Sequence, residues 1–238
     1  MIRILALQAC TVLALAAAPE LAHARLHPFV VVGGQASKAE KDDVDKLLDP
    51  ITIHQSSGSW EAGGGLQFNT GHNAATNADG PVDIGLRLTY GRGTLPDESF
   101  SGTRSDFSYH HSYEVSYTES FHYTGWTAGA LFSYRVLPHG GFYLGPVLQT
   151  ANFKAERSWE GPTDCFECGP ASDKSMTRYG QLELGANAIP FNVPLRIEGY
   201  WIPWRRELST THIVQSDIYT ANFSALKNAL GMRLAYQF

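Results

Sequence analysis

Apolar and polar residues alternate along several stretches of this chain, most clearly at its carboxyl end. In residues 230–238 every even position is apolar or aromatic, and the odd positions are small or polar. A period of two with one apolar face is the pattern of a β-strand whose two faces meet different environments. These residues therefore predict a strand with one apolar and one polar face.

Similar alternating stretches recur upstream, near the length of about 9–11 residues that a tilted strand needs to cross a membrane. We identify eight, at residues 60–69, 82–91, 106–118, 123–136, 142–153, 177–189, 195–207 and 224–238. An even number is expected of a bacterial barrel built from one chain. The predicted fold is all-β, a transmembrane antiparallel up-and-down β-barrel over residues 59–238.

The links between these stretches give the barrel an orientation. If residue 238 ends on the periplasmic side, short and long links should alternate. The links at 137–141 and 190–194 are short and periplasmic, whereas 155–176 and 209–222 are long and external. Two links do not fit this alternation. Residues 92–105 are long for a periplasmic turn and 118–122 are short for an external loop, so the registers before residue 120 stay open.

The amino-terminal residues predict export. Residues 1–24 begin with a positive Arg3 and continue with an apolar stretch that is too short for a spanning helix. They end in Ala22, His23 and Ala24, the small-x-small pattern that signal peptidase reads. We expect a cleaved signal peptide.

Residues 25–58 are predicted to form a periplasmic extension ahead of the barrel. Ser37 and Glu40 make a capping box and Pro50 closes the stretch, so a short helix is expected over residues 38–49. A disordered charged linker is the alternative. Phe29-Val30-Val31-Val32 is a possible strand, which would change the strand count if it entered the barrel wall.

Composition supports an exported barrel. The net charge of −5 argues against nucleic acid as a partner, because nucleic-acid binding needs a basic face. Charged residues make up only 17% of the chain and aromatic residues 12%, and no later segment has the apolar length of a spanning helix. The sequence predicts no cofactor and no metal site.

Alternation also places charged side chains inside the barrel. The set is Glu61, Asp83, Arg87, Glu114, Arg135, Glu183, Arg196, Glu198 and Arg233. Because side chains fill the interior of an eight-stranded barrel, these charges must pair. We expect Arg87 to pair with Glu114 on a neighbouring strand. Glu183 and Arg233 should complete the centre of this network.

The alternating stretches and the terminal strand resemble the OmpA/OmpX-type small barrels of bacterial outer membranes. The resemblance implies that the barrel assembly machinery recognises Leu230, Met232, Leu234, Tyr236 and Phe238. It also implies a monomer among outer-membrane lipids and lipopolysaccharide, with a structural or surface-binding role. Any extracellular ligand would bind the loops at 155–176 and 209–222.

Two other functions stay open, a narrow channel and a lipid A-modifying enzyme, either deacylase or acyltransferase. The pairs His110/Ser112 and His122/Thr124 are similar to the His-x-Ser pair of the lipid A deacylase barrels. In that family an asparagine follows the serine and a glutamate lies further along, whereas here Tyr113 or Gly125 follows and no glutamate lies at the matching distance after either pair. We therefore expect polar residues that satisfy one another, and no catalytic set.

Cys165 and Cys168 form a CxxC pair in the longest predicted external loop. A zinc site would need two more ligands, and the loop offers only carboxylates. Because an oxidising periplasm favours disulfides, we expect a local disulfide between them.

Overall fold

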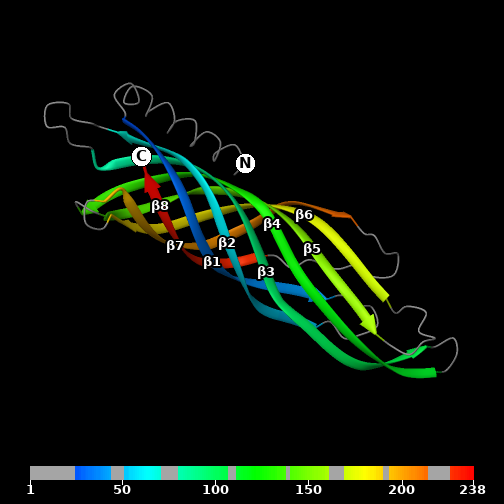
Figure 1. The fold of residues 1–238 in the computed structure, drawn as a ribbon. Coiled ribbons are helices and arrows are strands. Elements are labelled where there is room, and N and C mark those ends of the chain that lie inside the picture. Colours follow the sequence, from blue (N-terminus) through cyan, green and yellow to red (C-terminus); the bar gives the residue numbers. More distant parts are fainter. Residues whose placement is uncertain are drawn as a thin grey trace.

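The computed structural model describes residues 25–43, 51–70, 80–106, 111–137, 140–160, 169–189, 193–213 and 226–238. They form eight strands: β1 (Arg25–Asp43), β2 (Ile51–Thr70), β3 (Val82–Asp106), β4 (His111–Leu137), β5 (Gly140–Glu160), β6 (Gly169–Ala188), β7 (Leu195–Ile213) and β8 (Leu226–Gln237). Each strand pairs antiparallel with its neighbours in the chain, and β8 pairs with β1 (Figure 1). The predicted eight-stranded, up-and-down barrel is confirmed. Among the described residues, no helix has the length and apolar character needed to span a membrane.

The predicted extension at residues 25–58 is instead part of the wall. Strand β1 begins at Arg25 and pairs with β2 on one side and β8 on the other. The helix expected over residues 38–49 is therefore wrong as far as Asp43, and residues 44–50 lie outside the described part. The physical reason is that β1 pairs with β8 as far as Ala39 and with β2 as far as Asp43, and this backbone pairing overrides the local capping signal at Ser37 and Glu40.

The number of strands is still eight. The predicted stretches at 106–118 and 123–136 lie mostly in one strand, β4, and β1 adds a strand that is not among the predicted stretches. Strand β4 runs without interruption through residues 118–122, where the sequence indicated an external loop. It pairs with a β3 that continues to Asp106, through most of the predicted link at 92–105. The two links that broke the alternation of short and long are therefore strand, not loop.

The strands reach unequally far at the two ends of the barrel. At the end that holds residue 238, the connections between β4 and β5 and between β6 and β7 are short. At the other end β3, β4, β5 and β6 extend furthest, to the lower right of Figure 1. Strand β4 begins fifteen residues before Trp126, about 50 Å of strand at about 3.3 Å per residue.

The register fixes how strongly the strands are staggered. Following paired residues once around the wall leads from Arg25 on β1, through all eight strands, back to Gln35. The stagger is ten residues along β1. Such a stagger tilts the strands relative to the barrel axis and closes the lumen around a core that side chains can fill.

The outer wall carries a band of exposed apolar residues. On β8, Leu230 and Met232 are 64% and 65% exposed and Leu234 is 47% exposed. On β3 and β4 the band runs nine residues, from Val82 to Tyr90 and from Trp126 to Tyr134 on the facing strand. That length matches the roughly 9–11 residues of a membrane-crossing strand.

Aromatic side chains mark the two edges of this band. Tyr90 and Trp126 contact each other with ring centroids 5.1 Å apart, and Trp60 is two residues further out along β2 from the residue facing Tyr90. At the other edge, Tyr236 packs on Phe238 at 5.2 Å. Trp60 lies in the middle of β2, because that strand begins at Ile51.

Candidate functional site: the lumen and the outer wall

The centre of the lumen is a carboxylate held by two arginines. Glu183 on β6 is completely buried. Arg87 on β3 donates to its two oxygens at 3.1 and 2.7 Å, and Arg233 on β8 donates to the same two at 2.7 and 3.2 Å. Both guanidinium groups therefore bind one carboxylate in the two-pronged geometry that suits arginine.

A second carboxylate joins β2 to this centre. Glu61 accepts a hydrogen bond from Nε of Arg233, one from Thr89 at 2.7 Å and one from the Tyr200 hydroxyl at 3.0 Å. The guanidinium of Arg233 also lies 3.5 Å from the centroid of the Tyr200 ring. Arg233 thus links two acids and an aromatic ring across the barrel.

The network continues toward the end of the barrel that holds residue 238. Arg196 pairs with Glu198 at 2.8 Å, and Glu198 lies 4.0 Å from Arg87. Below them Arg135 pairs with Asp83 at 3.4 Å. Of the predicted residues, four acids and four arginines lie in the described interior, and the formal charges of these eight cancel.

Glu114, which the sequence analysis paired with Arg87, lies elsewhere. It faces Thr103 in the β3–β4 register, whereas the residue that faces Arg87 is Gly129, fifteen residues further along β4. The mispairing follows from the false break at residues 118–122, which separated β4 into two strands. The partner of Arg87 is Glu183, three strands away across the lumen.

Aromatic residues fill the lumen on the outer side of the network. Tyr123, Phe153 and Tyr179 form a buried cluster, with ring centroids 5.7 and 6.5 Å apart along the series. Arg205 on β7 enters beside it and donates from Nε to Gln181 at 2.7 Å. The sequence analysis omitted Arg205. Pro203 is the signal for it, because a proline inside a strand marks a bulge that shifts the alternation, and the β6–β7 register is irregular there.

Glycines make room for two tyrosines of the network. A Cβ on Gly231 would lie 2.2 Å from the Tyr200 ring, and one on Gly185 would lie 2.3 Å from the Tyr143 ring. Both rings cross the lumen next to glycine backbone on the neighbouring strand. Only glycine permits this approach, so these two positions set where the rings lie.

Little space remains inside the barrel. A cavity of about 20 Å³ borders Gln149 and Arg233, and one of about 30 Å³ borders Arg87 and Glu198. Each has room for about one water molecule. A larger polar hollow of about 310 Å³ opens at the end that holds residue 238 and is lined by Asp83 and Arg135, among others. It ends at the network and does not continue through it.

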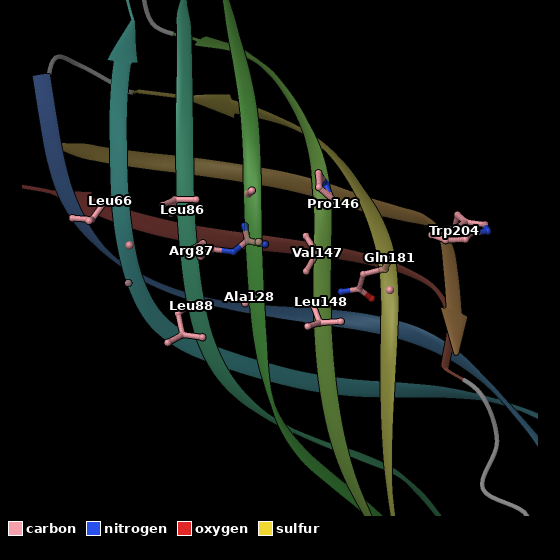
Figure 2. A pocket seen from close by; sticks show the side chains of 15 residues that line it. Leu66, Leu86, Arg87, Leu88, Ala128, Pro146, Val147, Leu148, Gln181 and Trp204 are labelled. Carbon is pink, nitrogen blue, oxygen red and sulfur yellow. The ribbon is translucent and has the colours of Figure 1, made fainter. Parts of the chain in front are cut away.

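The outer wall has concave features of its own, among them an apolar furrow of about 750 Å³ that spans β2 to β7 (Figure 2). Small outward-facing residues form its floor: Gly64, Ala128, Ala130, Pro146 and Gly180. Leu66, Leu86, Leu88, Leu148 and Trp204 rise around them. Near Pro146, the pairing of β4 with β5 skips Ala130 and Leu131, because proline has no amide hydrogen to donate to a neighbouring strand.

The remaining predicted site residues fall in three groups. The apolar residues of the terminal strand, Leu230, Met232, Leu234, Tyr236 and Phe238, are exposed on the outer wall. His122 and Thr124 share the alternation phase of Trp126 on β4. Cys165, Cys168, His110 and the signal peptide at 1–24 lie outside the described residues. The predicted external loops at 155–176 and 209–222 are partly strand, because β5 continues to Glu160, β6 begins at Gly169 and β7 continues to Ile213.

Comparisons with known proteins give structural likeness only. No protein-family model matches the chain, and no curated protein matches its sequence. Among solved structures, Ail of Yersinia pestis, in complex with the heparin analogue sucrose octasulfate, is 11% identical with a TM-score of 0.46; the match covers 89% of this chain and 99% of Ail. Neisserial surface protein A is 8% identical with a TM-score of 0.40, covering 88% and 97%. The outer membrane protease OmpT of Escherichia coli is 13% identical with a TM-score of 0.34, covering 90% and 96%.

Proposed function

We propose that this chain is an outer-membrane β-barrel that works through its outer surface, with a lumen closed to solutes. The band of exposed apolar residues supports the location, since a soluble protein rarely exposes so large a continuous apolar surface. The aromatic side chains at both edges of the band fit the two membrane interfaces.

The observation that carries the closed lumen is the charge-balanced network around Glu183. It joins β2, β3, β6 and β8 across the full width of the barrel. The aromatic cluster at Tyr123, Phe153 and Tyr179 adds a second barrier on the outer side. A solute would have to separate buried ion pairs in order to pass, which is costly in a low-dielectric interior.

Conductance tests this function. Purified barrel in a planar bilayer should give no steady current, and liposomes containing it should not swell in arabinose. The Glu183→Ala/Arg233→Ala variant should raise leakage if the network is the barrier. A steady unitary conductance of the unaltered protein would show a channel and overturn the proposal.

The surface-binding part of the proposal rests on the strands that leave the membrane. Strands β3 to β6 continue well beyond Tyr90 and Trp126 and form a sheet outside the apolar band. Such a sheet can present a binding surface on the cell exterior. Flow cytometry with an epitope inserted at residues 107–110 should label intact cells, and labelling only after permeabilisation would contradict this orientation.

A lipid-modifying enzyme is the second candidate, and one observation favours it. His122 and Thr124 lie on the outer face of β4, in phase with the exposed Trp126, which is where a lipid-directed site would have to be. Mass spectrometry of lipid A from a host expressing the barrel decides it. Loss or gain of an acyl chain that disappears with His122→Ala would establish the enzyme, whereas an unchanged spectrum leaves the surface-binding role.

A further inference from the structure

Two arginines flank the outer end of the apolar furrow on the lipid-facing wall. Gly180 is the furrow residue on β6, and Arg206 of β7 faces it directly in the register. Arg178 is the next outward-facing residue along β6. Both arginines are exposed, and among the described residues neither has an acidic partner.

A second pair of cations lies further out on the same wall. Lys154 on β5 faces Lys174 on β6 directly, and on its other side it faces His122 on β4. Like charges directly opposite each other destabilise an antiparallel pair unless a counter-charge is present. Glu156 accepts a hydrogen bond from Lys154, which lowers the pKa of the Glu156 carboxyl. That contact leaves Lys174 uncompensated among the described residues.

The spacing of the two cation pairs allows one ligand to contact both. Lys174 and Arg178 are four residues apart on β6, about 13 Å at about 3.3 Å per residue. The arginine pair is level with the furrow end, and the lysine pair lies beyond it, outside the membrane. An apolar groove that ends in two successive cation pairs is complementary to an acyl chain joined to two anionic groups.

We propose that the β4–β6 wall binds a lipid whose headgroup carries two phosphates. One acyl chain lies in the furrow over Ala128, Pro146 and Gly180. One phosphate binds between Arg178 and Arg206, and the other between Lys154 and Lys174. Phosphate suits both pairs, because arginine binds its oxygens in a two-pronged geometry and lysine binds it as a point charge. The inference rests on the proposed outer-membrane location.

Native mass spectrometry of the detergent-purified barrel tests the headgroup. The probes are diphosphoryl lipid A, monophosphoryl lipid A and phosphatidylethanolamine, added in parallel titrations. The barrel should retain one diphosphoryl molecule at the lowest concentration and the monophosphoryl form more weakly. Equal retention of all three lipids would overturn the proposal.

Charge variants locate the two phosphate sites. A basic residue near an anionic lipid surface contributes about fivefold in affinity, so Lys154→Gln/Lys174→Gln should weaken diphosphoryl lipid A about 25-fold. The weakened affinity should match that of the monophosphoryl form. The matched control Lys154→Arg/Lys174→Arg keeps both charges and should bind as the parent does. Glu156→Gln removes the competing carboxylate and should strengthen binding, and weaker binding by this variant would count against Lys154 as a ligand.

A furrow variant separates acyl from phosphate recognition. Ala128→Phe fills the furrow floor, whereas Ala186→Phe adds the same ring to an exposed alanine outside it. Only the first should release diphosphoryl lipid A, and both should keep the gel mobility of a folded barrel. Competition by inorganic pyrophosphate equal to that by the lipid would show a simple anion site and contradict the acyl part. If all lipid tests fail while the barrel stays non-conducting in the outer membrane, only this inference is wrong.

Discussion

At the residue scale, the interior depends on Glu183 because two guanidinium groups share it. Its side chain and those of Arg87 and Arg233 are at most 2% exposed. In such a position the loss of one partner leaves a buried charge uncompensated, which costs more than the pair contributes when intact. The three residues are therefore not equivalent.

Glu183→Gln should destabilise the barrel by about 3–5 kcal/mol, because it leaves both arginines without their shared carboxylate. Arg87→Gln should cost less, since Arg233 still holds Glu183 at both oxygens. Thermal unfolding in detergent, followed by circular dichroism, gives the ranking. The exposed Arg92→Gln should stay within about 0.5 kcal/mol of the parent, and a reversed order of Glu183 and Arg87 would contradict the shared-carboxylate geometry.

The contacts of Tyr200 provide a second residue-scale prediction. Gly231→Ala places a methyl group about 2.2 Å from the Tyr200 ring, so the ring must move away from Glu61 and Arg233. Overpacking of this kind costs about 1–3 kcal/mol. Gly199→Ala is the control, because a Cβ there meets nothing within 4 Å. Equal melting temperatures for the two variants would show that the ring has room that the structure denies it.

At the element scale, alternation predicted most strands but not their ends. Five of the predicted stretches fall within single strands and two more each overlap one strand, because a period of two is visible wherever one face meets lipid. It fails at residues 118–122, where β4 continues beyond the apolar band and the lipid no longer selects apolar residues on one face. It indicated β1 only as a possible strand at Phe29 to Val32, because these residues are apolar at consecutive positions and Gly33 follows.

The lumen was predictable in membership but not in pairing. Eight of the nine charged residues proposed from alternation face the interior, because inward phase is a local property of each strand. Which of them meet depends on the stagger of the whole barrel, and that is not encoded in any one strand. This is why Glu183 was placed correctly while its contact with Arg87 was not foreseen.

A shortened hairpin tests whether the outer parts of β3 and β4 contribute to the stability of the barrel. Replacing residues 96–120 by a two-residue Asn-Gly turn removes the outer parts of β3 and β4. The variant should still fold, because the network and the membrane band contain none of these residues. Unchanged heat-dependent gel mobility is the expected result, and loss of the folded band would mean that the extension is needed for assembly.

At the scale of the whole molecule, the described barrel has an apolar outer band and a polar interior in which acids pair with arginines. This is the reverse of a soluble protein and requires a lipid environment. The backbone pairing is complete around the described wall, apart from irregularities such as that near Pro146. Heat and detergent must therefore break a closed ladder before the chain can unfold.

The expected signature is heat modifiability. Unboiled protein in dodecyl sulfate should migrate as a compact band and boiled protein at its unfolded mass, which is below the 26.1 kDa of the full sequence once residues 1–24 are removed. The Glu183→Gln variant should convert at a lower temperature than the parent. Identical mobility before and after boiling, together with recovery in the soluble periplasmic fraction, would contradict a membrane barrel.

Arg233 also bears on the order of events in assembly. It lies on β8, the last of the eight strands in the chain, yet its partners Glu61 and Glu183 lie on β2 and β6. The ion pairs that Arg233 makes across the lumen therefore cannot form until β8 has joined β1 and closed the barrel. Once formed, these ion pairs stabilise the contact between β8 and β1, because separating the two strands would also break the pairs of Arg233 with Glu61 and Glu183. The network therefore opposes the separation of β8 from β1. We expect the barrel to unfold slowly even if its equilibrium free energy of unfolding is modest.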